Sequence, residues 1–427
     1  MKVLIVGGGG REHAIALKIK ENPEVTALYA APGNGGIAQI ATCLPFKATD
    51  VDGIVRWAAE NKVDFVIVAP DDPLCLGMVD ALAEQGIPAF GPRKNAAIIE
   101  GSKVFSKNLM KKYGIPTAAY ETFDDYDAAV KYLQTADMPI VVKADGLALG
   151  KGVLICPDRE SAVEAVASMM KEAKFGASGA RVVIEEFLTG PEVSVLAFTD
   201  GKTVKPMVSS MDHKRALDHD EGLNTGGMGT IAPNPCYTPE LARRCMDEIF
   251  LPTIAAMNAE GRTFTGCLYF GLMMTPKGPK VIEYNCRFGD PETQVVLPLL
   301  KSDLLTIMRA TVDGTLADTP VEFASGAACC VVLASGGYPV SYKSGYQISG
   351  LDEAGENATV FHAGTKLVDG QIVTAGGRVL GVTATADTLE AAIDKAYQAA
   401  DKITFTDMHM RRDIGQRALA SRKESHS

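Results

Sequence analysis

The first hundred residues alternate between short apolar runs and helical stretches, and this alternation constrains the fold more than any other feature. Its apolar runs predict strands and the segments between them predict helices. Strands are expected at Val3–Val6, Val25–Ala30, Asp64–Ala69 and Ile87–Phe90, and helices at Arg11–Lys20, Ile54–Asn61 and Val79–Gln85. Strands separated by helices form a doubly wound parallel sheet, in which ligands bind beyond the carboxyl ends of the strands. The loops at those ends are therefore candidate ligand contacts.

The pattern changes after residue 92, and again near residue 325. One long helix is expected over Asn95–Tyr113, followed by a small lid with strands at Ile140–Lys143, Val153–Cys156 and Val182–Glu186. Further strands and helices follow up to residue 324. From residue 325 the chain is β-rich, with strands expected at Ala327–Ala334 and Val379–Thr385 and an alanine-rich helix at Leu389–Ala400. The sequence therefore predicts several folding units of mixed α/β and α+β class.

Charge and cysteine spacing exclude several classes of protein. The chain has 42 Lys and Arg against 52 Asp and Glu, a net charge of −10, which argues against a broad nucleic-acid interface. Its 9 cysteines form no Cys-x-x-Cys pair, which favours reduced thiols over disulfides or a zinc site. No apolar run approaches the roughly 20 residues that span a bilayer, and the first one is too short for a signal peptide. We expect a cytoplasmic protein with neither membrane nor nucleic acid as partner.

Two glycine-rich segments are candidate phosphate contacts. Gly7–Gly10 follows a strand and opens a helix, where backbone N–H groups can meet a phosphate. A dinucleotide fingerprint would need a third glycine where Glu12 stands, so a phosphorylated or sugar-like ligand is favoured; the alternative is a tight turn only. Gly146–Gly152 joins two strands, unlike a Walker loop. With Lys143 before it and Lys151 at its tip, it suits a flap over phosphates, or a plain hairpin.

Carboxylates and amides at strand ends suggest nucleotide and metal contacts. The strand ending at Glu186 can offer backbone groups to an adenine edge, and Glu192 can accept ribose hydroxyl protons. Glu283, Asn285 and Arg287 alternate along a strand and therefore share one face. Carboxylate and amide oxygens suit Mg²⁺, and an arginine beside them can clamp a carboxylate or phosphate. The alternative is a polar strand face or a simple ion pair.

A long polar segment contains Asp212–Arg215 and Asn224–Gly229. It is too rich in glycine and charge for a core element, so we expect it to contact substrate. His213 within it is a candidate general base, although a lone histidine among charges is more often a surface or hydrogen-bonding residue.

Taken in order, these motifs resemble the ATP-grasp ligases. The resemblance rests on Lys103, the run Val141–Gly152, the pair Glu185 and Glu186, Glu192, and Glu283–Asn285. The strings Asp212–Arg215, Asn224–Gly229 and Arg287–Glu292 narrow it to the glycinamide ribonucleotide synthetases, also called phosphoribosylamine–glycine ligases. Gly7–His13, Pro32–Asn34 and Ser335–Pro339 agree at the two ends, so the resemblance covers essentially the whole chain.

The resemblance implies a fold and a reaction. The fold has an N-terminal doubly wound parallel sheet (1–102), an ATP-grasp core (103–120 and 189–324), a small lid (121–188) and a C-terminal β-rich domain (325–427). The implied reaction joins glycine to 5-phosphoribosylamine at the expense of ATP, through glycyl phosphate, in de novo purine biosynthesis. It requires Mg²⁺ or Mn²⁺, and a monomer is expected. Gly271–Met274, the strand before Glu283, offers no acidic ligand, so the number of metal ions stays open.

The resemblance also implies roles for individual residues. The residues expected to bind ATP are Lys103, Lys143, Gly150, Lys151, Glu185, Glu186, Leu188 and Glu192. Those expected to bind the other substrates are Gly9, Asn34, Asp212, His213, Lys214, Asn224, Thr225, Gly226, Gly227 and Arg287. Metal binding is expected from Glu283 and Asn285, and catalytic contacts from Arg287, Lys143 and Lys151.

Three alternatives remain at this point. Another ATP-grasp ligase, such as a carboxylase of a purine intermediate, would lack the Asp212–Arg215 and Arg287–Glu292 strings in this form. A dinucleotide-dependent oxidoreductase is disfavoured by the missing third glycine and by the absence of an acid after the second strand. A nucleotide-binding regulatory protein without catalysis would share the binding motifs.

Overall fold

The computed structural model describes residues 1–148 and 151–424. Its N-terminal part is a five-stranded parallel sheet in the order β3-β2-β1-β4-β5. The strands are β1 (Lys2–Gly7), β2 (Ala27–Pro32), β3 (Thr42–Cys43), β4 (Phe65–Val68) and β5 (Ala89–Phe90). The helices are α1 (Gly10–Lys20), α2 (Val51–Glu60), α3 (Asp71–Cys75) and α4 (Met78–Glu84). The predicted parallel sheet is confirmed.

Alternating residues of β1 explain why this sheet is covered on both faces. Leu4 and Val6 pack into one apolar core with Ile54 of α2, whereas Val3 and Ile5 pack into another with Ile15 of α1. Successive side chains of a strand point to opposite faces, so a continuous apolar run requires two covering layers.

The single helix expected over Asn95–Tyr113 is in fact two, α5 (Lys94–Gly101) and α6 (Lys103–Tyr113). Ser102 separates them with an extended backbone, and its hydroxyl caps α6 by accepting from the Phe105 N–H at 3.1 Å. The same hydroxyl donates to Asp145 at 2.8 Å. Helical periodicity does not reveal such a break, because the side-chain bonds of Ser102 replace the helical bonds that are lost.

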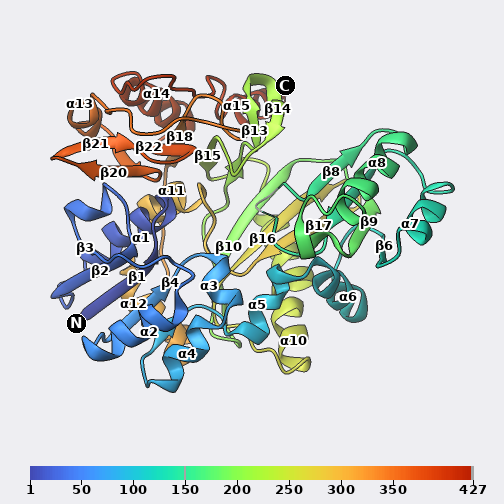
Figure 1. Cartoon of the computed structure of the whole chain (residues 1–427), viewed down its shortest axis with the longest axis horizontal. Coiled ribbons are helices and arrows are strands. Elements are labelled where there is room, and N and C mark those ends of the chain that lie inside the picture. Colours follow the sequence, from blue (N-terminus) through green and yellow to red (C-terminus); the bar gives the residue numbers. More distant parts are fainter. Residues whose placement is uncertain (149–150, 425–427) are drawn as a thin grey trace.

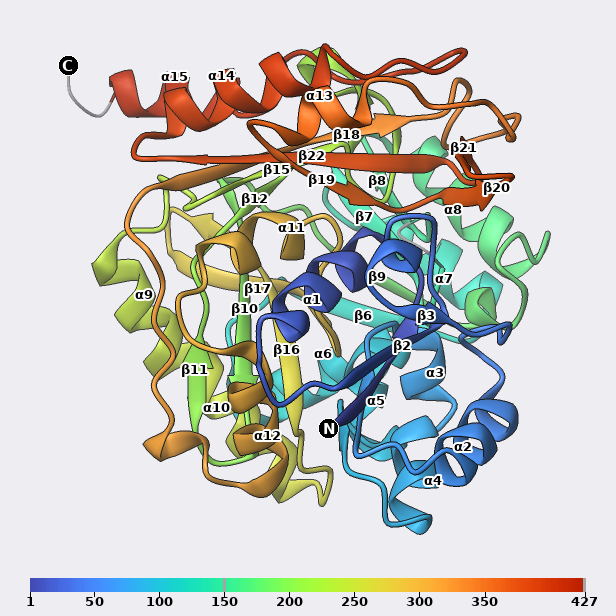
Figure 2. The ribbon, with the colours of Figure 1, turned by 90° about the vertical axis from the view of Figure 1, so that its left-hand side faces the viewer.

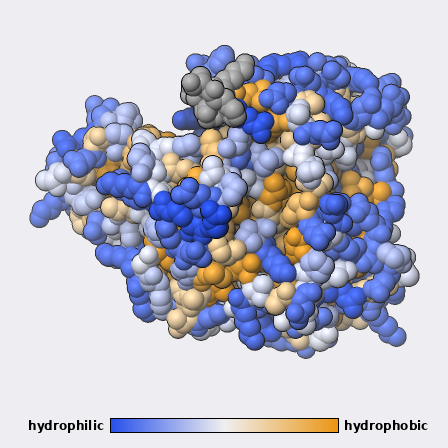
Figure 3. Space-filling view, turned by 180° about the vertical axis from the view of Figure 1, so that it is seen from behind, coloured by the Kyte–Doolittle hydropathy of each residue, from blue (hydrophilic) through white to orange (hydrophobic). Residues whose placement is uncertain are grey.

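Residues 120–186 form the lid, which stands out from the body as a separate lobe (Figures 1 and 3). Its antiparallel sheet has the order β6-β9-β7-β8, and α7 and α8 pack on one face. The elements are β6 (Tyr120–Phe123), α7 (Tyr126–Leu133), β7 (Ile140–Ala144), β8 (Val153–Cys156), α8 (Arg159–Met170) and β9 (Val182–Glu186). Strand β6 was not expected from the sequence.

The core sheet beside the lid is antiparallel, in the order β11-β10-β16-β17. Its strands are β10 (Glu192–Thr199), β11 (Val204–Pro206), β16 (Gly266–Thr275) and β17 (Gly278–Asn285). The helices that follow or precede them are α9 (Pro239–Cys245), α10 (Leu251–Ala259) and α12 (Leu304–Asp313). Phe270 faces the core that contains Phe250 next to α10, and Tyr269 faces the one that contains Leu304 of α12.

The last sheet lies across the top of the molecule, with α13 (Leu351–Gly355) and α14 (Leu389–Ala400) on its outer face and α1 and α11 (Thr293–Val296) beneath it (Figure 2). Its order is β12-β15-β18-β22-β19. The strands are β12 (Met211–Asp212), β15 (Gly229–Ala232), β18 (Ala327–Ala334), β19 (Thr359–His362) and β22 (Arg378–Ala386). Two of these strands come from residues 211–232, so the polar segment expected to contact substrate is hydrogen-bonded into this sheet.

Two small hairpins and a last helix complete the chain. The hairpins are β13 (Arg215–Leu217) with β14 (Glu221–Asn224), and β20 (Thr365–Val368) with β21 (Gln371–Thr374); the helix is α15 (Gln416–Glu424). Across the two described ranges, no helix has the length and apolar character needed to cross a membrane.

Candidate active site

A pocket of about 1010 Å³ lies where the lid, the core sheet, the N-terminal sheet and the C-terminal sheet meet. Each of these parts contributes to its wall, for example Lys143 from the lid, Glu283 from the core sheet, Asp71 from the N-terminal part and Arg378 from β22. A pocket at the junction of four parts of the chain can hold several substrates at once, each against a different wall. On the face of the molecule drawn in Figure 3, hydrophilic residues cover most of the surface and apolar residues form separate patches.

The lid side of the pocket contains a buried carboxylate between two ammonium groups. Glu185 of β9 pairs with Lys143 of β7 and with Lys107 of α6, the latter at 2.6 Å. Lys107 also donates to the Thr117 hydroxyl at 2.7 Å. Burial lowers the pKa of Lys107 to about 8, whereas the two lysines hold the pKa of Glu185 below its ordinary value despite burial. Two cations against one anion leave a positive charge on this wall, which suits phosphate groups.

Lys103 is fixed beside this cluster by the lid residue Asp145. Asp145 accepts hydrogen bonds from the Ser102 hydroxyl at 2.8 Å and from the Val104 N–H at 2.9 Å. Arg181 donates to its other carboxylate oxygen at 2.6 and 3.0 Å. The Lys103 ammonium donates to the Gly146 carbonyl at 3.0 Å. The start of α6 and the base of the flap are therefore held together.

The core strand β17 carries the predicted metal ligands. Glu283 and Asn285 both line the pocket, as their alternation along the strand predicts. Burial alone would raise the pKa of Glu283, but the ammonium groups of Lys214, Lys143 and Lys103 outweigh it, and the pKa lies below its ordinary value. An ionised carboxylate beside an amide oxygen is a donor set that fits a hard divalent cation. In the described residues no group of three His, Cys, Asp or Glu side chains could hold a metal by itself, so further ligands would have to come from substrate or water.

Arg287 lies next to these two residues but is already paired. Its guanidinium contacts Glu100 of α5 at 3.0 Å and donates to the Asn285 amide oxygen at 3.3 Å. Its buried Nε has no hydrogen-bond partner among the described residues. An unpartnered buried donor is costly, which makes Nε the part of Arg287 available to a bound anion.

Lys214 bridges the core sheet to the polar segment. Its ammonium lies 3.4 Å from Glu192 and 3.8 Å from Glu283, and Glu192 in particular raises the pKa of Lys214 well above its ordinary value. Asp212 and Glu292 lie on the same wall, where burial raises the pKa of both carboxyls, and the charge of Glu292 adds to the effect on Asp212. Tyr269 donates to Glu292 at 2.9 Å.

The N-terminal loops expected to contact substrate lie outside the wall of this pocket. The Gly9 N–H donates to Glu12 at 2.8 Å, and neither Gly9 nor Asn34 lines the pocket. The Asn34 amide donates to the Gly8 and His362 carbonyls at 2.9 and 2.8 Å, and its oxygen accepts from the Gly36 and Ile37 N–H groups. Asn34 therefore joins the N-terminal loops to the C-terminal sheet.

His213, which is also expected to contact substrate, does not line the pocket. Only 2% of the residue is exposed, and its Nδ1 lies 3.1 Å from the Gly229 carbonyl. Its Nε2 accepts from the Gly415 N–H at 3.1 Å, and burial lowers the pKa of the ring to about 4. Both nitrogens are engaged and the ring is neutral, so His213 can act on the site only through the segment that it holds.

The pocket brings together most of the residues predicted from the sequence. The predicted residues on its wall are Lys103, Lys143, Lys151, Glu185, Glu186, Leu188, Glu192, Asp212, Lys214, Asn224, Thr225, Gly226, Glu283, Asn285 and Arg287. Gly227, like Gly9, Asn34 and His213, does not line it, and Gly150 lies outside the described residues.

Sequence reasoning missed Lys107, Glu100 and Arg378. Lys107 follows Lys103 by one helical turn, and that i, i+4 spacing is a signal that could have identified it. Glu100 meets Arg287, and Arg378 meets Gly226 and Asp290, only through the folded chain. Nothing in their local sequence indicates these partners.

Comparisons with known proteins agree along the entire chain. Family models of phosphoribosylglycinamide synthetase match residues 1–100 as the N domain, 101–293 as the ATP-grasp (A) domain and 328–417 as the C domain. A phosphoribosylamine–glycine ligase of Halalkalibacterium halodurans is 49% identical over 425 residues, covering 100% of this chain and 99% of that protein.

Solved structures give the same result. The crystal structure of a phosphoribosylamine–glycine ligase from Thermotoga maritima has a TM-score of 0.86 at 35% identity and covers 97% of this chain and 100% of its own. A biotin carboxylase from Campylobacter jejuni, in its β-γ-ATP complex, has a TM-score of 0.75 at 15% identity over 96% of this chain and 92% of its own, which shows a common fold alone. With close to half of all residues identical to a full-length ligase, this chain belongs to the phosphoribosylamine–glycine ligase family, the glycinamide ribonucleotide synthetases.

Proposed function

We propose that this protein joins glycine to 5-phosphoribosylamine, forming glycinamide ribonucleotide, ADP and phosphate in purine biosynthesis. The observation that carries the proposal is full-length identity of 49% to a phosphoribosylamine–glycine ligase. The pocket supports it with a cationic wall on the lid, a carboxylate and an amide on β17 of the core sheet and a third, mixed wall from the polar segment. The expected monomeric state stays a prediction.

In this proposal ATP lies between the lid and β17. Lys103, Lys143 and Lys151 bind its phosphates, with the surplus positive charge of the Lys107–Glu185–Lys143 cluster behind them. Backbone groups from Glu186 to Leu188 face the adenine edge, and the exposed carboxylate of Glu192 accepts from the ribose hydroxyls. Positioning and charge neutralisation are the main contributions of a protein to phosphoryl transfer.

Glu283 and Asn285 would hold the divalent ion, either Mg²⁺ or Mn²⁺. Their oxygens share one face of β17, and the carboxylate is ionised because ammonium groups surround it. When bound, such an ion neutralises charge on the β- and γ-phosphates during transfer. The chain's own part is to keep Glu283 charged and to orient both side chains toward the phosphates.

The proposed reaction has two steps. A carboxylate oxygen of glycine attacks the γ-phosphorus of ATP, ADP leaves, and glycyl phosphate forms. The amine of phosphoribosylamine then attacks the acyl carbon, and the carbon–oxygen bond to phosphate breaks. In this proposal Arg287 steadies the carboxylate or the acyl phosphate, and its unpartnered Nε on the pocket wall supports this role. His213 does not act as a base here, because both of its ring nitrogens are engaged.

An assay of ADP release tests the function. ADP release is expected with glycine plus phosphoribosylamine, and at most slowly with either substrate alone. Bicarbonate in place of glycine tests the carboxylase alternative, and is expected to give no release above background. Equal ADP release with and without phosphoribosylamine, or release that depends on bicarbonate, would contradict the proposal.

A further inference from the structure

Arg411 is a charged side chain in the interior of the protein, with 1% of its surface exposed. Its Nε and Nη2 donate to the two carboxylate oxygens of Asp413 at 2.8 and 2.9 Å. Its Nη1 donates to the Arg215 carbonyl and to the Asp220 carboxylate, each at 3.1 Å. Burying a guanidinium is costly unless it is fully paired, so these four bonds fix where Arg411 must lie.

These bonds belong to a larger set that ties one stretch of chain to one hairpin. We call residues His409–Arg417 the C-terminal strap, and β13 with β14 the substrate hairpin. The strap contacts the hairpin through His409, whose Nε2 lies 2.7 Å from the Ala216 carbonyl, and through Arg417, which donates to Asp220 at 2.7 Å. The Arg412 N–H donates to Asp218 at 2.7 Å, and the His219 N–H donates to Asp413 at 2.9 Å.

The substrate hairpin needs such support. It is a two-stranded sheet with only three and four residues in its strands, and hairpins of this size are marginal in water. At its turn His219 and Asp220 have φ values of +61° and +56°, a left-handed conformation that costs non-glycine residues free energy, and two such residues in succession need support from their surroundings. The bonds from Asp413, Arg411 and Arg417 act on these same two residues.

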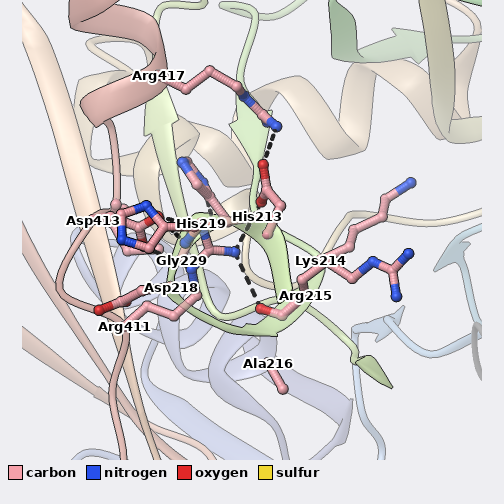
Figure 4. Close-up of polar contacts among 12 residues, drawn as sticks. His213, Lys214, Arg215, Ala216, Asp218, His219, Gly229, Arg411, Asp413 and Arg417 are labelled. Carbon is pink, nitrogen blue, oxygen red and sulfur yellow. Dashed lines mark hydrogen bonds and ion pairs between the residues drawn. The ribbon is translucent and has the colours of Figure 1, made fainter. Parts of the chain in front are cut away.

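The substrate hairpin also faces the pocket. Lys214, Arg215, Asn224 and Thr225 line it, as do Asp220 of the turn and Arg417 of the strap. Figure 4 shows the side chains of Lys214 and Arg215 extending away from Arg411 and Asp413. Arg215 donates to the Gly222 carbonyl at 2.7 Å and pairs with no carboxylate among the described residues. Its charge is therefore available to an anionic ligand such as a sugar phosphate.

From this arrangement we propose that Arg411 and Asp413 are positioning residues for phosphoribosylamine. By holding the turn of the substrate hairpin and the Arg215 carbonyl, the strap fixes Arg215 at the place where the phosphorylated sugar amine binds. This inference rests on the proposed function. His409, Arg411 and Asp413 bond the hairpin and its turn, and no hydrogen bond of the strap among the described residues reaches Lys103, Lys143 or Lys151. We therefore expect its main effect on phosphoribosylamine rather than on ATP.

The test compares Asp413→Asn with Asp401→Asn in the full-length protein. Asp413→Asn keeps the size of the side chain but removes the charge that pairs with Arg411, and Asp413 does not line the pocket. We expect the KM for phosphoribosylamine to rise roughly tenfold, the scale of a lost charge-assisted bond, with kcat and the KM for ATP within about twofold. Asp401→Asn removes the 2.6 Å partner of Arg412 on the outer side of the same strap and should leave every constant unchanged.

A second pair of variants covers the case in which Asp413→Asn fails to fold. His409→Ala removes the bond to the Ala216 carbonyl, and His409→Gln can restore it with an amide N–H. The alanine variant should raise the KM for phosphoribosylamine, and the glutamine variant should return it toward wild type. An unchanged KM for phosphoribosylamine, or equal increases for ATP and phosphoribosylamine, would overturn the proposal. Failure of the wild-type protein to use phosphoribosylamine at all would instead overturn the proposed function.

Discussion

Glu283 is the residue on which the proposed phosphoryl transfer depends most. It is the carboxylate of the β17 face, and Gly271 opposite it on β16 offers no second acid. Replacing Glu283 by Gln keeps its size and removes the charge that would hold the divalent ion against the phosphates. We expect kcat to fall by roughly a hundredfold or more, on the order of 3–4 kcal/mol of transition-state stabilisation, and the half-saturating Mg²⁺ concentration to rise.

The measurement is the initial rate as a function of Mg²⁺ for wild type, Glu283→Gln and a control, Glu248→Gln. Glu248 pairs with Arg244 on the surface and does not line the pocket. A Glu283→Gln protein with the wild-type rate and Mg²⁺ dependence would contradict the assignment of the metal site.

Lys107 gives a prediction about pH at the same scale. Its pKa of about 8 means that it carries a positive charge at pH 7 and loses it as the pH rises toward 9. Loss of that charge leaves Glu185 to neutralise Lys143, so the KM for ATP should rise between pH 7 and 9. Lys107→Met should have a KM raised roughly three- to tenfold at pH 7, with little further change at higher pH.

Lys111→Met is the matched control, because Lys111 lies on the exposed side of the same helix, over the Tyr120 ring at 5.7 Å. The measurement is the KM for ATP of wild type, Lys107→Met and Lys111→Met at pH 7, 8 and 9. The same pH dependence in wild type and Lys107→Met would show that Lys107 does not influence the nucleotide.

Single residues also show what the sequence reveals and what it does not. Alternation along a strand was sufficient to bring Glu283 and Asn285 to one wall of the pocket. Arg287 lies on the same wall, but the alternation does not reveal that its charge is shared with Glu100 from another element. Likewise His213 stands among charges in the sequence but is buried in the fold. Its ring accepts a hydrogen bond from the N–H of Gly415, a residue near the far end of the chain that the local sequence does not indicate.

At the scale of elements, the break between α5 and α6 positions Lys103. The Ser102 hydroxyl caps the N-terminus of α6 and also donates to Asp145, so the start of this helix is bonded to the lid. Ser102→Ala should cost about 1–2 kcal/mol of stability and leave Asp145 short of one donor. Because Lys103 is the next residue, we expect the KM for ATP to rise several-fold as well.

Thr388→Ala is the control for this effect, because Thr388 caps α14, the helix that packs on the C-terminal sheet, by accepting from the Ala391 N–H at 3.2 Å. It should lower the melting temperature in the same way and leave the KM for ATP unchanged. If both variants raise the KM for ATP equally, the cap at Ser102 has no special role in the site.

Elements with strong periodicity were predictable, and elements defined by tertiary pairing were not. The predicted limits of β18 and α14 agree with the structure residue for residue, since an unbroken apolar run and an amphipathic alanine-rich stretch are local signals. Strands β12 and β15 have few residues and many polar neighbours. They become strands only because β18 offers a partner to β15, and β15 one to β12.

For the whole molecule, two buried histidines join the N-terminal and C-terminal parts. The His362 N–H donates to Nδ1 of His13 at 2.8 Å, and each residue is 5% exposed. Burial lowers the pKa of His13 to about 3 and that of His362 to about 4. Above pH 6.5 both rings are neutral whether the chain is folded or unfolded. Below pH 6.5, the two histidines bind protons in the unfolded chain but not in the folded protein, so the free energy of unfolding decreases as the pH falls toward 4.

We therefore expect roughly 2 kcal/mol of lost stability per histidine at pH 5 relative to pH 7. The midpoint of urea unfolding at the two pH values measures this. In the variant with both His13→Asn and His362→Asn, which keeps a polar atom near each Nδ1, the midpoint should change less between pH 7 and pH 5 than in wild type. An equal change in both proteins would place the acid sensitivity elsewhere in the molecule.

The central claim for the whole molecule is that the pocket activates the carboxylate of glycine as an acyl phosphate. Turnover with glycine labelled by ¹⁸O in both carboxylate oxygens, followed by mass analysis of the phosphate released, tests it most directly. The oxygen that attacks the γ-phosphorus leaves with phosphate when the amine displaces it, so each phosphate should carry one ¹⁸O and each glycinamide ribonucleotide should keep the other. Phosphate without ¹⁸O, formed at the same rate as the amide, would contradict the account.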